Sequence, residues 1–110
     1  MEITISAYQE YLRERYTGWT TEQSLFMKLV EECGEVAEVL NKRAGYKESG
    51  HEDLDMDLGS ELADMLHYIV AIAGINGIDL NAVMLEKDKR ASVKYHHETN
   101  LGIFLTERNQ

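Results

Sequence analysis

The sequence predicts an all-α protein that forms a four-helix bundle-like domain, and three observations support this fold class. The chain has no proline and is rich in Ala, Leu, Glu, Lys and Met, which are strong helix formers. Its apolar residues recur at intervals of three and four over long segments. Its length of 110 residues, 44% of them hydrophobic, suits one ordinary domain with a real core. We therefore expect residues 1–110 to form a single domain.

Four helices are expected, and the residues at their ends set the boundaries. Thr17-Gly18-Trp19-Thr20 ends the first helix, and Thr20 or Thr21 can cap the second. A polar segment over residues 45–57 leads to the third helix, and Asp79 begins the fourth. The C-terminal arm is expected to be either extended or a short helix. The predicted ranges are 6–16, 22–43, 58–76 and 79–95 for the helices and 96–110 for the arm.

Composition excludes several classes of protein. A net charge of −9 disfavours binding to a nucleic acid polymer, because the surface offers no cationic face. The single Cys33 rules out a disulfide framework or a cysteine zinc site and is expected to be buried. The N-terminus does not resemble a signal peptide, and the apolar segment 65–75 is too short to span a bilayer. We expect a soluble, cytoplasmic protein without a membrane partner.

The expected second helix carries four glutamates that do not all share one face. At about 100° per residue, an apolar stripe forms, and Glu31 and Glu38 fall roughly opposite it. Glu32 and Glu35 fall at the margin of the stripe, three residues apart and on one face. The stripe consists of Leu25, Phe26, Leu29, Cys33, Val36, Ala37 and Leu40.

The expected third helix is apolar on nearly all sides between residues 62 and 75, which predicts burial. Glu61 and Asp64 form a second acidic pair at a spacing of three. Ionised carboxylates are expensive to bury without partners, and four together need compensating cations. Mg²⁺ or Mn²⁺, which prefer oxygen ligands, fit this requirement. The spacing therefore favours a metal site made by Glu32, Glu35, Glu61 and Asp64.

Two simpler interpretations compete with this one. A single Glu-x-x-Glu pair is usually a solvated helix face, but two pairs on successive helices favour a site. A di-iron carboxylate bundle would need two Glu-x-x-His motifs, and Asp64-x-x-His67 is the only related helical pattern. His67 is therefore interpreted as a core histidine or as a residue that supports the ligands. The adjacent His96 and His97 are left without a role.

At these residues the sequence resembles the MazG-like nucleoside triphosphate pyrophosphohydrolases of the all-α pyrophosphatase superfamily. The resemblance covers roughly residues 20–95 and lies in LVEECGEVAEVL, SELADMLHYIVAIAGINGIDL and LEKDKRASVKY. It implies Mg²⁺-dependent hydrolysis of (deoxy)nucleoside triphosphates between the α and β phosphates, with nucleotide-pool cleansing as the expected role. It also implies that Glu32, Glu35, Glu61 and Asp64 bind Mg²⁺, and that Glu32 or Glu35 orients or deprotonates the attacking water.

The resemblance also suggests residues that contact the substrate. The closing helix of this family usually carries a Lys, an Asn four residues later and an Arg three residues further. These positions hold Lys87, Ala91 and Lys94 here, so Lys87 and Lys94 are expected to contact phosphates without the bidentate fork of an Arg. Trp19 is the candidate for stacking on the nucleobase, although it could also be a hydrophobic plug at the start of the helix.

The resemblance further implies a homodimer or homotetramer, in which a second subunit closes the carboxylate surface. The first helix and the segment Leu101–Leu105 are the expected contacts. Two alternatives stay open at this point. One is a phosphoribosyl-ATP-type pyrophosphohydrolase, since Ala91 departs from the family pattern. The other is a non-enzymatic helical module whose acidic surface binds a basic partner.

Overall fold

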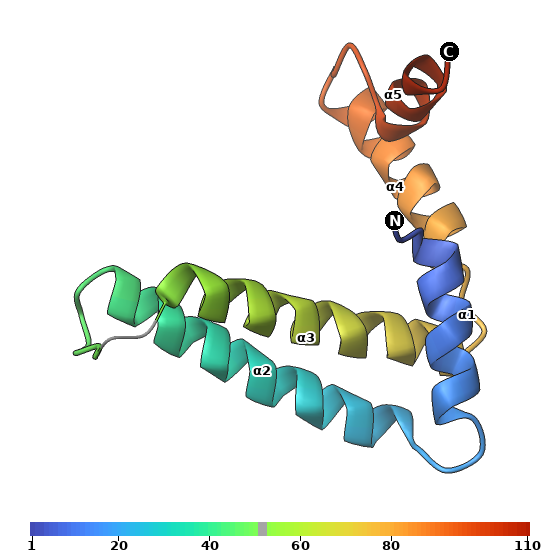
Figure 1. Cartoon of the computed structure of the whole chain (residues 1–110). Coiled ribbons are helices and arrows are strands. Elements are labelled where there is room, and N and C mark those ends of the chain that lie inside the picture. Colours follow the sequence, from blue (N-terminus) through green and yellow to red (C-terminus); the bar gives the residue numbers. More distant parts are fainter. Residues whose placement is uncertain (51–52) are drawn as a thin grey trace. The chain divides into compact units, whose positions relative to one another are not determined.

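The computed structural model describes residues 1–50 and 53–110, which form helices and no strand. Five helices are present in this part of the chain (Figure 1): α1 Ile5–Tyr16, α2 Glu22–Arg43, α3 Leu54–Ile75, α4 Leu80–Lys94 and α5 Leu101–Arg108. The predicted all-α fold class is confirmed.

The helices divide into two compact units, Met1–Ile78 and Asp79–Gln110. The first contains α1, α2 and α3, and the second contains α4 and α5. Each unit is described by itself below. The expectation of a single domain stays a prediction.

Short polar side chains fix where the helices begin. The hydroxyl of Thr21 accepts a hydrogen bond from the Ser24 amide, and the Ser24 hydroxyl accepts one from the Thr21 amide. This reciprocal capping box starts α2 at Glu22. Asp53 caps α3 by accepting from the Met56 amide, so α3 begins at Leu54 rather than at residue 58. The predicted connection over 45–57 was wrong for residues 54–57, and residues 51–52 lie outside the described part.

The C-terminal arm forms the short helix α5, which decides between the two expected conformations. Asn100 caps this helix by accepting from the Ile103 amide. The Asp88 carboxylate of α4 accepts a hydrogen bond from the Leu101 amide, 2.5 Å away. Side-chain acceptors from two elements thus hold the start of α5 against α4.

In the first unit, α2 and α3 run side by side as an antiparallel hairpin and α1 packs on α3 (Figure 1). The closest approach of α1 and α3 is at Gly74, where an added Cβ would lie 3.0 Å from the Gln9 carbonyl oxygen. The core residues of this unit are Leu12, Tyr16, Leu25, Val39, Val70, Ala71 and Ala73.

The buried face of α2 differs from the predicted stripe. Leu25 and Val39 are buried, and Leu29, Glu32 and Val36 between them are half-buried. Glu32 therefore lies within the face that packs on α3, not at its margin. Cys33, which was predicted to be buried, is exposed. The error arises because α2 has two apolar faces, and the sequence does not show which of them contacts α3.

The second apolar face runs along the hairpin and is exposed within the first unit. Its residues recur at intervals of four and three on both helices, which is the spacing of a helix–helix seam. We call this surface the uncovered stripe; it consists of Phe26, Val30, Cys33, Ala37 and Leu40 on α2 and Leu62, Leu66 and Ile69 on α3. Contiguous apolar patches of this kind usually mark an interaction surface.

The helix α3 has 22 residues and is long and apolar enough, by length and composition alone, to cross a membrane. The apolar segment 65–75 lies within it. The core helix of a soluble protein passes the same test, and α3 packs against both α1 and α2. These contacts account for part of its apolar character, while Leu62, Leu66 and Ile69 stay exposed within the first unit.

Candidate functional site

Three acidic side chains meet where α2 packs on α3. Carboxylate oxygens of Glu32, Glu61 and Asp64 all lie within 4.8 Å of one another. Glu32 comes from the buried face of α2, while Glu61 and Asp64 share one face of α3 because they are three residues apart. The helix packing thus brings one acid of the α2 pair, Glu32, to both acids of the α3 pair.

Glu35, the fourth predicted ligand, lies outside this group of three but close to Glu61. Hydrogen bonding to Glu32 and then to Glu35, followed by burial and repulsion from both charges, raises the pKa of Glu61 to about 8. A carboxyl group can donate such a hydrogen bond only when it is protonated. Without a cation, the cluster therefore favours a proton on Glu61 at neutral pH.

Two buried oxygens of the cluster, when the carboxylates are ionised, have no donor among the described residues. Glu32 Oε2 and Glu61 Oε2 are buried and lack a hydrogen-bond partner within the described residues. None of the ion pairs in that part of the chain involves Glu32, Glu35, Glu61 or Asp64. A native protein rarely leaves buried polar atoms unpaired unless a ligand, an ion or a water satisfies them.

The other two glutamates of α2 behave as ordinary surface acids. Glu31 pairs with Lys28 at 3.3 Å, and Glu38 pairs with Lys47 at 2.9 Å and with Lys42 at 3.8 Å. Both lie on the exposed side of the helix, as the sequence predicts. The nearby lysines thus compensate the outer acids, whereas the inner acids make no ion pair among the described residues.

The donor set fits a divalent cation. All candidate ligand atoms are carboxylate oxygens, which Mg²⁺ and Mn²⁺ prefer. A cation would replace the proton on Glu61 and satisfy the two buried oxygens. The residues present are therefore able to hold the metal ion that the sequence resemblance implies.

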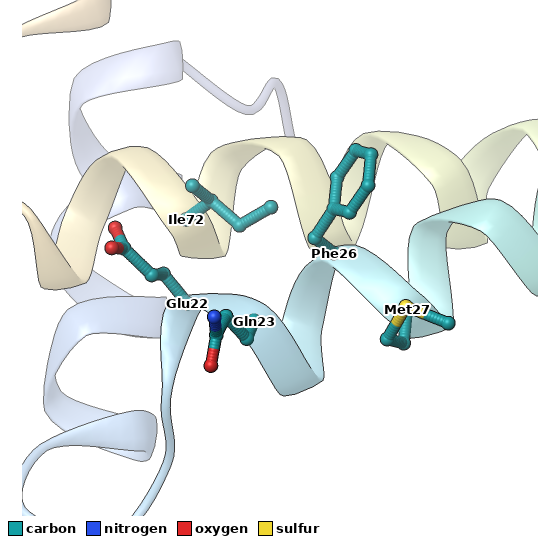
Figure 2. Close-up of a pocket in the computed structure, with 5 residues that line it drawn as sticks. All are labelled: Glu22, Gln23, Phe26, Met27 and Ile72. Atoms are coloured by element: carbon teal, nitrogen blue, oxygen red, sulfur yellow. The ribbon is translucent and has the colours of Figure 1, made fainter.

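An open pocket of about 640 Å³ lies on the same hairpin as the cluster. Glu22, Gln23, Phe26 and Met27 of α2 and Ile72 of α3 line it (Figure 2). Phe26 precedes Glu32 by six residues, which corresponds to about 9 Å along the helix axis. Phe26 also belongs to the uncovered stripe, so the pocket is one end of that surface.

Aromatic side chains contact His67, which lies one helical turn after Asp64. His67 Nε2 lies 2.7 Å from the Tyr16 hydroxyl, and His67 Nδ1 lies 3.4 Å from the Tyr8 hydroxyl. Burial, followed by the positive charge of Arg15, lowers the pKa of His67 below its ordinary value. Trp19, the predicted base-stacking residue, is 70% exposed and contacts the Tyr16 ring.

The predicted phosphate-contacting lysines lie together in the second unit. Lys87 and Lys94 line a hollow of about 240 Å³ with Arg90, Ala91 and Tyr95. The Lys94 ammonium lies 5.3 Å from the centre of the Tyr95 ring, within the range of a cation–π contact. Arg90 adds a third cation to this hollow and also pairs with Glu86 at 3.6 Å.

Comparison with known proteins places this arrangement in a family. The profile of the MazG nucleotide pyrophosphohydrolase domain matches residues 20–96, a segment that includes all four acids and both lysines. The chain belongs to the MazG family. At the level of that family, it is a nucleotide pyrophosphohydrolase.

A solved structure supports the same assignment. The crystal structure of iMazG from Vibrio DAT 722 is 29% identical, with a TM-score of 0.63. The match covers 84% of this chain and 98% of iMazG. No curated protein sequence matches the chain. The MazG-like resemblance read from the acidic motifs is therefore confirmed.

Proposed function

We propose that this protein hydrolyses (deoxy)nucleoside triphosphates between the α and β phosphates in the presence of Mg²⁺ and releases a monophosphate and pyrophosphate. The observation that carries the proposal is the meeting of Glu32, Glu61 and Asp64, with buried oxygens that lack a partner. The expected role is the removal of excess or non-standard nucleotides.

Glu32, Glu35, Glu61 and Asp64 are proposed to hold the Mg²⁺ ion. When bound, the ion would offset the negative charge of the phosphates and make phosphorus more electrophilic. Without it, the unit formed by residues 1–78, which has 15 acidic and 6 basic residues, would repel a triphosphate. Mn²⁺ is an acceptable substitute, because it shares the preference for oxygen ligands.

The chain's own carboxylates are proposed to handle the proton of the attacking water. Glu32 and Glu35 lie on one face of α2, and Glu35 is exposed to solvent whereas Glu32 is half-buried. One of them would orient the water and accept its proton as the oxygen attacks phosphorus and the bridging P–O bond breaks. Pyrophosphate would then leave with the electron pair of that bond.

The substrate contacts outside the cluster are proposed to come from Trp19, Lys87 and Lys94. Trp19 is 70% exposed, so a nucleobase could stack on its ring. Lys87 and Lys94 are seven residues apart and line the same hollow, so their ammonium groups can approach one phosphate chain.

A second copy of the chain is proposed to cover the uncovered stripe and complete a four-helix arrangement. The stripe has the heptad-like spacing of a helix–helix seam and lies on the same hairpin as the carboxylates. The expected assembly is a homodimer or a pair of dimers. The pocket beside Phe26 would then be filled or closed by the partner copy.

The activity can be tested with a panel of ribo- and deoxyribonucleoside triphosphates and Mg²⁺, scored separately for pyrophosphate and phosphate. We expect pyrophosphate with at least one nucleotide and its loss in Glu35→Gln and Asp64→Asn. Glu31→Gln, which changes an outer acid of the same helix, is the matched control and should keep activity. Phosphate release alone would contradict cleavage between the α and β phosphates.

Three other results would also overturn this proposal. Full activity in both Glu35→Gln and Asp64→Asn would remove the carboxylate cluster from the mechanism. Hydrolysis of phosphoribosyl-ATP with no activity on any nucleoside triphosphate would keep the family but change the substrate. Absence of any nucleotide hydrolysis would favour the non-enzymatic acidic module.

A further inference from the structure

Trp19 is exposed, yet two contacts hold it. It follows α1 in a turn where Gly18 has a φ of +86°. Its indole Nε1 donates a hydrogen bond to the Arg15 carbonyl oxygen at 3.1 Å. Its ring packs against the Tyr16 ring with the centroids 5.5 Å apart and the planes tilted by 47°. The direction of the indole therefore depends on where the Tyr16 ring lies.

The Tyr16 ring is in turn fixed by His67. Tyr16 is buried, so its hydroxyl needs a hydrogen-bond partner inside the protein. His67 Nε2 supplies that partner at 2.7 Å, and the two rings meet edge to face at 5.7 Å. Rotation of Tyr16 away from this position would break its hydrogen bond to His67 and remove the surface against which the Trp19 ring packs.

His67 itself is held from the opposite side. Its Nδ1 lies 3.4 Å from the Tyr8 hydroxyl, and its ring meets the edge of Tyr68 with centroids 5.0 Å apart. A neutral imidazole offers one donor and one acceptor, so the two tyrosine hydroxyls take opposite roles. His67 also follows Asp64 by three residues, which places it one helical turn from the carboxylate cluster.

We propose that His67 is a positioning residue which, through the Tyr16 hydroxyl, holds Trp19 in the orientation that stacks on the nucleobase. The connection runs from α3, which carries Glu61 and Asp64, through α1 to the turn that carries Trp19. It keeps the predicted base contact at a fixed position relative to the carboxylate cluster of the same unit. The nucleobase in this inference rests on the proposed function. The effect of His67 and Tyr16 on the orientation of Trp19 does not depend on that function.

The test uses Trp19 as its own reporter, because it is the only tryptophan. The variants are Tyr16→Phe, which removes only the hydroxyl, and His67→Phe, which keeps a ring without hydrogen bonds. We expect both to increase quenching of Trp19 fluorescence by acrylamide. Both should also raise KM for the preferred nucleoside triphosphate by about fivefold, the effect of one lost neutral hydrogen bond, with kcat changed less than twofold.

Two controls separate positioning from general loss of structure. Tyr11→Phe removes an exposed hydroxyl from the same helix and should match the wild type in both readouts. His67→Gln keeps an amide that can bond to Tyr16 and should restore most of the affinity lost in His67→Phe. If His67→Phe does not fold, Tyr16→Phe alone carries the test.

The outcomes distinguish this inference from the proposed function. Unchanged acrylamide quenching and KM in Tyr16→Phe would overturn the inference, even if the wild type hydrolyses nucleotides. Equal loss of kcat in Tyr16→Phe and His67→Phe with unchanged KM would also overturn it, because a base contact would be expected to act on binding. If the wild type neither binds nor hydrolyses a nucleotide, the proposed function fails, and the inferred role in base stacking fails with it.

Discussion

Glu32 and Glu61 face each other between α2 and α3, and each has a buried carboxylate oxygen without a partner in the described part of the chain. The raised pKa of Glu61, about 8 against an ordinary value of 4.5, follows from this relationship and from the nearby Glu35. These two acids do not serve stability, because apolar residues at the same positions would avoid the cost of desolvating the carboxylates. The pair is therefore best understood as a site that a cation completes.

Without divalent cations, the stability of the protein should fall as the pH rises from about 4.5 to about 8. In this range the unfolded chain releases the Glu61 proton while the folded chain keeps it, so rising pH favours unfolding. Glu61 makes its full contribution to stability below its pKa in the unfolded chain. This contribution is lost as the pH rises through its pKa in the folded chain. Glu61→Gln cannot release a proton and should have a smaller slope in this range.

Urea unfolding in EDTA at several pH values between 5 and 8 measures these slopes. Glu38→Gln is the control, because its pKa is lowered by Lys47 and Lys42 and lies below the range tested. It should keep the slope of the wild type. A wild-type slope that equals the slope of Glu61→Gln would show that Glu61 does not hold a proton in the folded protein.

Addition of Mg²⁺ should stabilise the wild type and reduce its pH dependence. A ligand that binds only the folded state at a concentration of 100 times its Kd adds about 2.7 kcal/mol. Asp64→Asn and Glu61→Gln each remove one charge from the cluster and should lose most of this gain. Thermal unfolding with and without Mg²⁺ measures the effect, and Glu31→Gln should respond like the wild type. Equal stabilisation of the wild type and all three variants would show that Mg²⁺ binds outside the carboxylate cluster.

Helix packing explains how much of the site could be predicted from the sequence. The spacing of three within each acidic pair placed Glu32 with Glu35 and Glu61 with Asp64 on common faces, since helix geometry is local. The division between outer and inner glutamates also followed from the helical wheel. The meeting of α2 and α3 was a sound inference, because two long apolar helices joined by a short connection pack as a hairpin.

Other features of the structure could not be predicted from the sequence, most of them because they depend on tertiary contacts. Two apolar faces compete on α2, and the packing buries the one that contains Glu32 and leaves Phe26, Cys33 and Leu40 exposed. The start of α3 was misplaced because Asp53 was not recognised as a cap. The bridge between Tyr8, His67 and Tyr16 joins residues more than 50 positions apart, and no local pattern reports it.

Gly74→Ala should destabilise the protein by about 1–2 kcal/mol, as an overpacked helix contact does. The added Cβ would lie 3.0 Å from the Gln9 carbonyl oxygen and 3.4 Å from the Arg13 Cβ, and the backbone of α1 cannot yield as a flexible side chain would. Gly59→Ala is the control in the same helix, because no atom lies within 4 Å of its Cβ. It should stabilise by about 0.5–1 kcal/mol through helix propensity. Chemical denaturation measures the free energy of unfolding of both variants. Relative to the wild type, this free energy should fall in Gly74→Ala and rise in Gly59→Ala, and changes of the same sign would contradict the prediction.

Lys87→Ala and Lys94→Ala should each raise KM for a nucleoside triphosphate by about tenfold, which corresponds to a charge-assisted hydrogen bond of about 1.5 kcal/mol. Lys89 lies in the same helix but lines a different hollow, with α5, so Lys89→Ala is the matched control. Steady-state kinetics at fixed Mg²⁺ and ionic strength measure the effect. Equal changes in all three variants would indicate a general loss of positive charge rather than specific phosphate contacts.

Leu66→Glu should convert the protein to a monomer. Leu66 lies in the uncovered stripe at 45% exposure, and a buried carboxylate at an apolar seam between two copies has no partner. Met56→Glu introduces the same charge at another exposed position of α3, turned about 80° away from Leu66 on the helix, and should leave the assembly intact. Light scattering coupled to size-exclusion chromatography gives the mass of each variant. A wild type that is already monomeric, or a Leu66→Glu protein with the wild-type assembly, would show that a second copy does not cover the stripe.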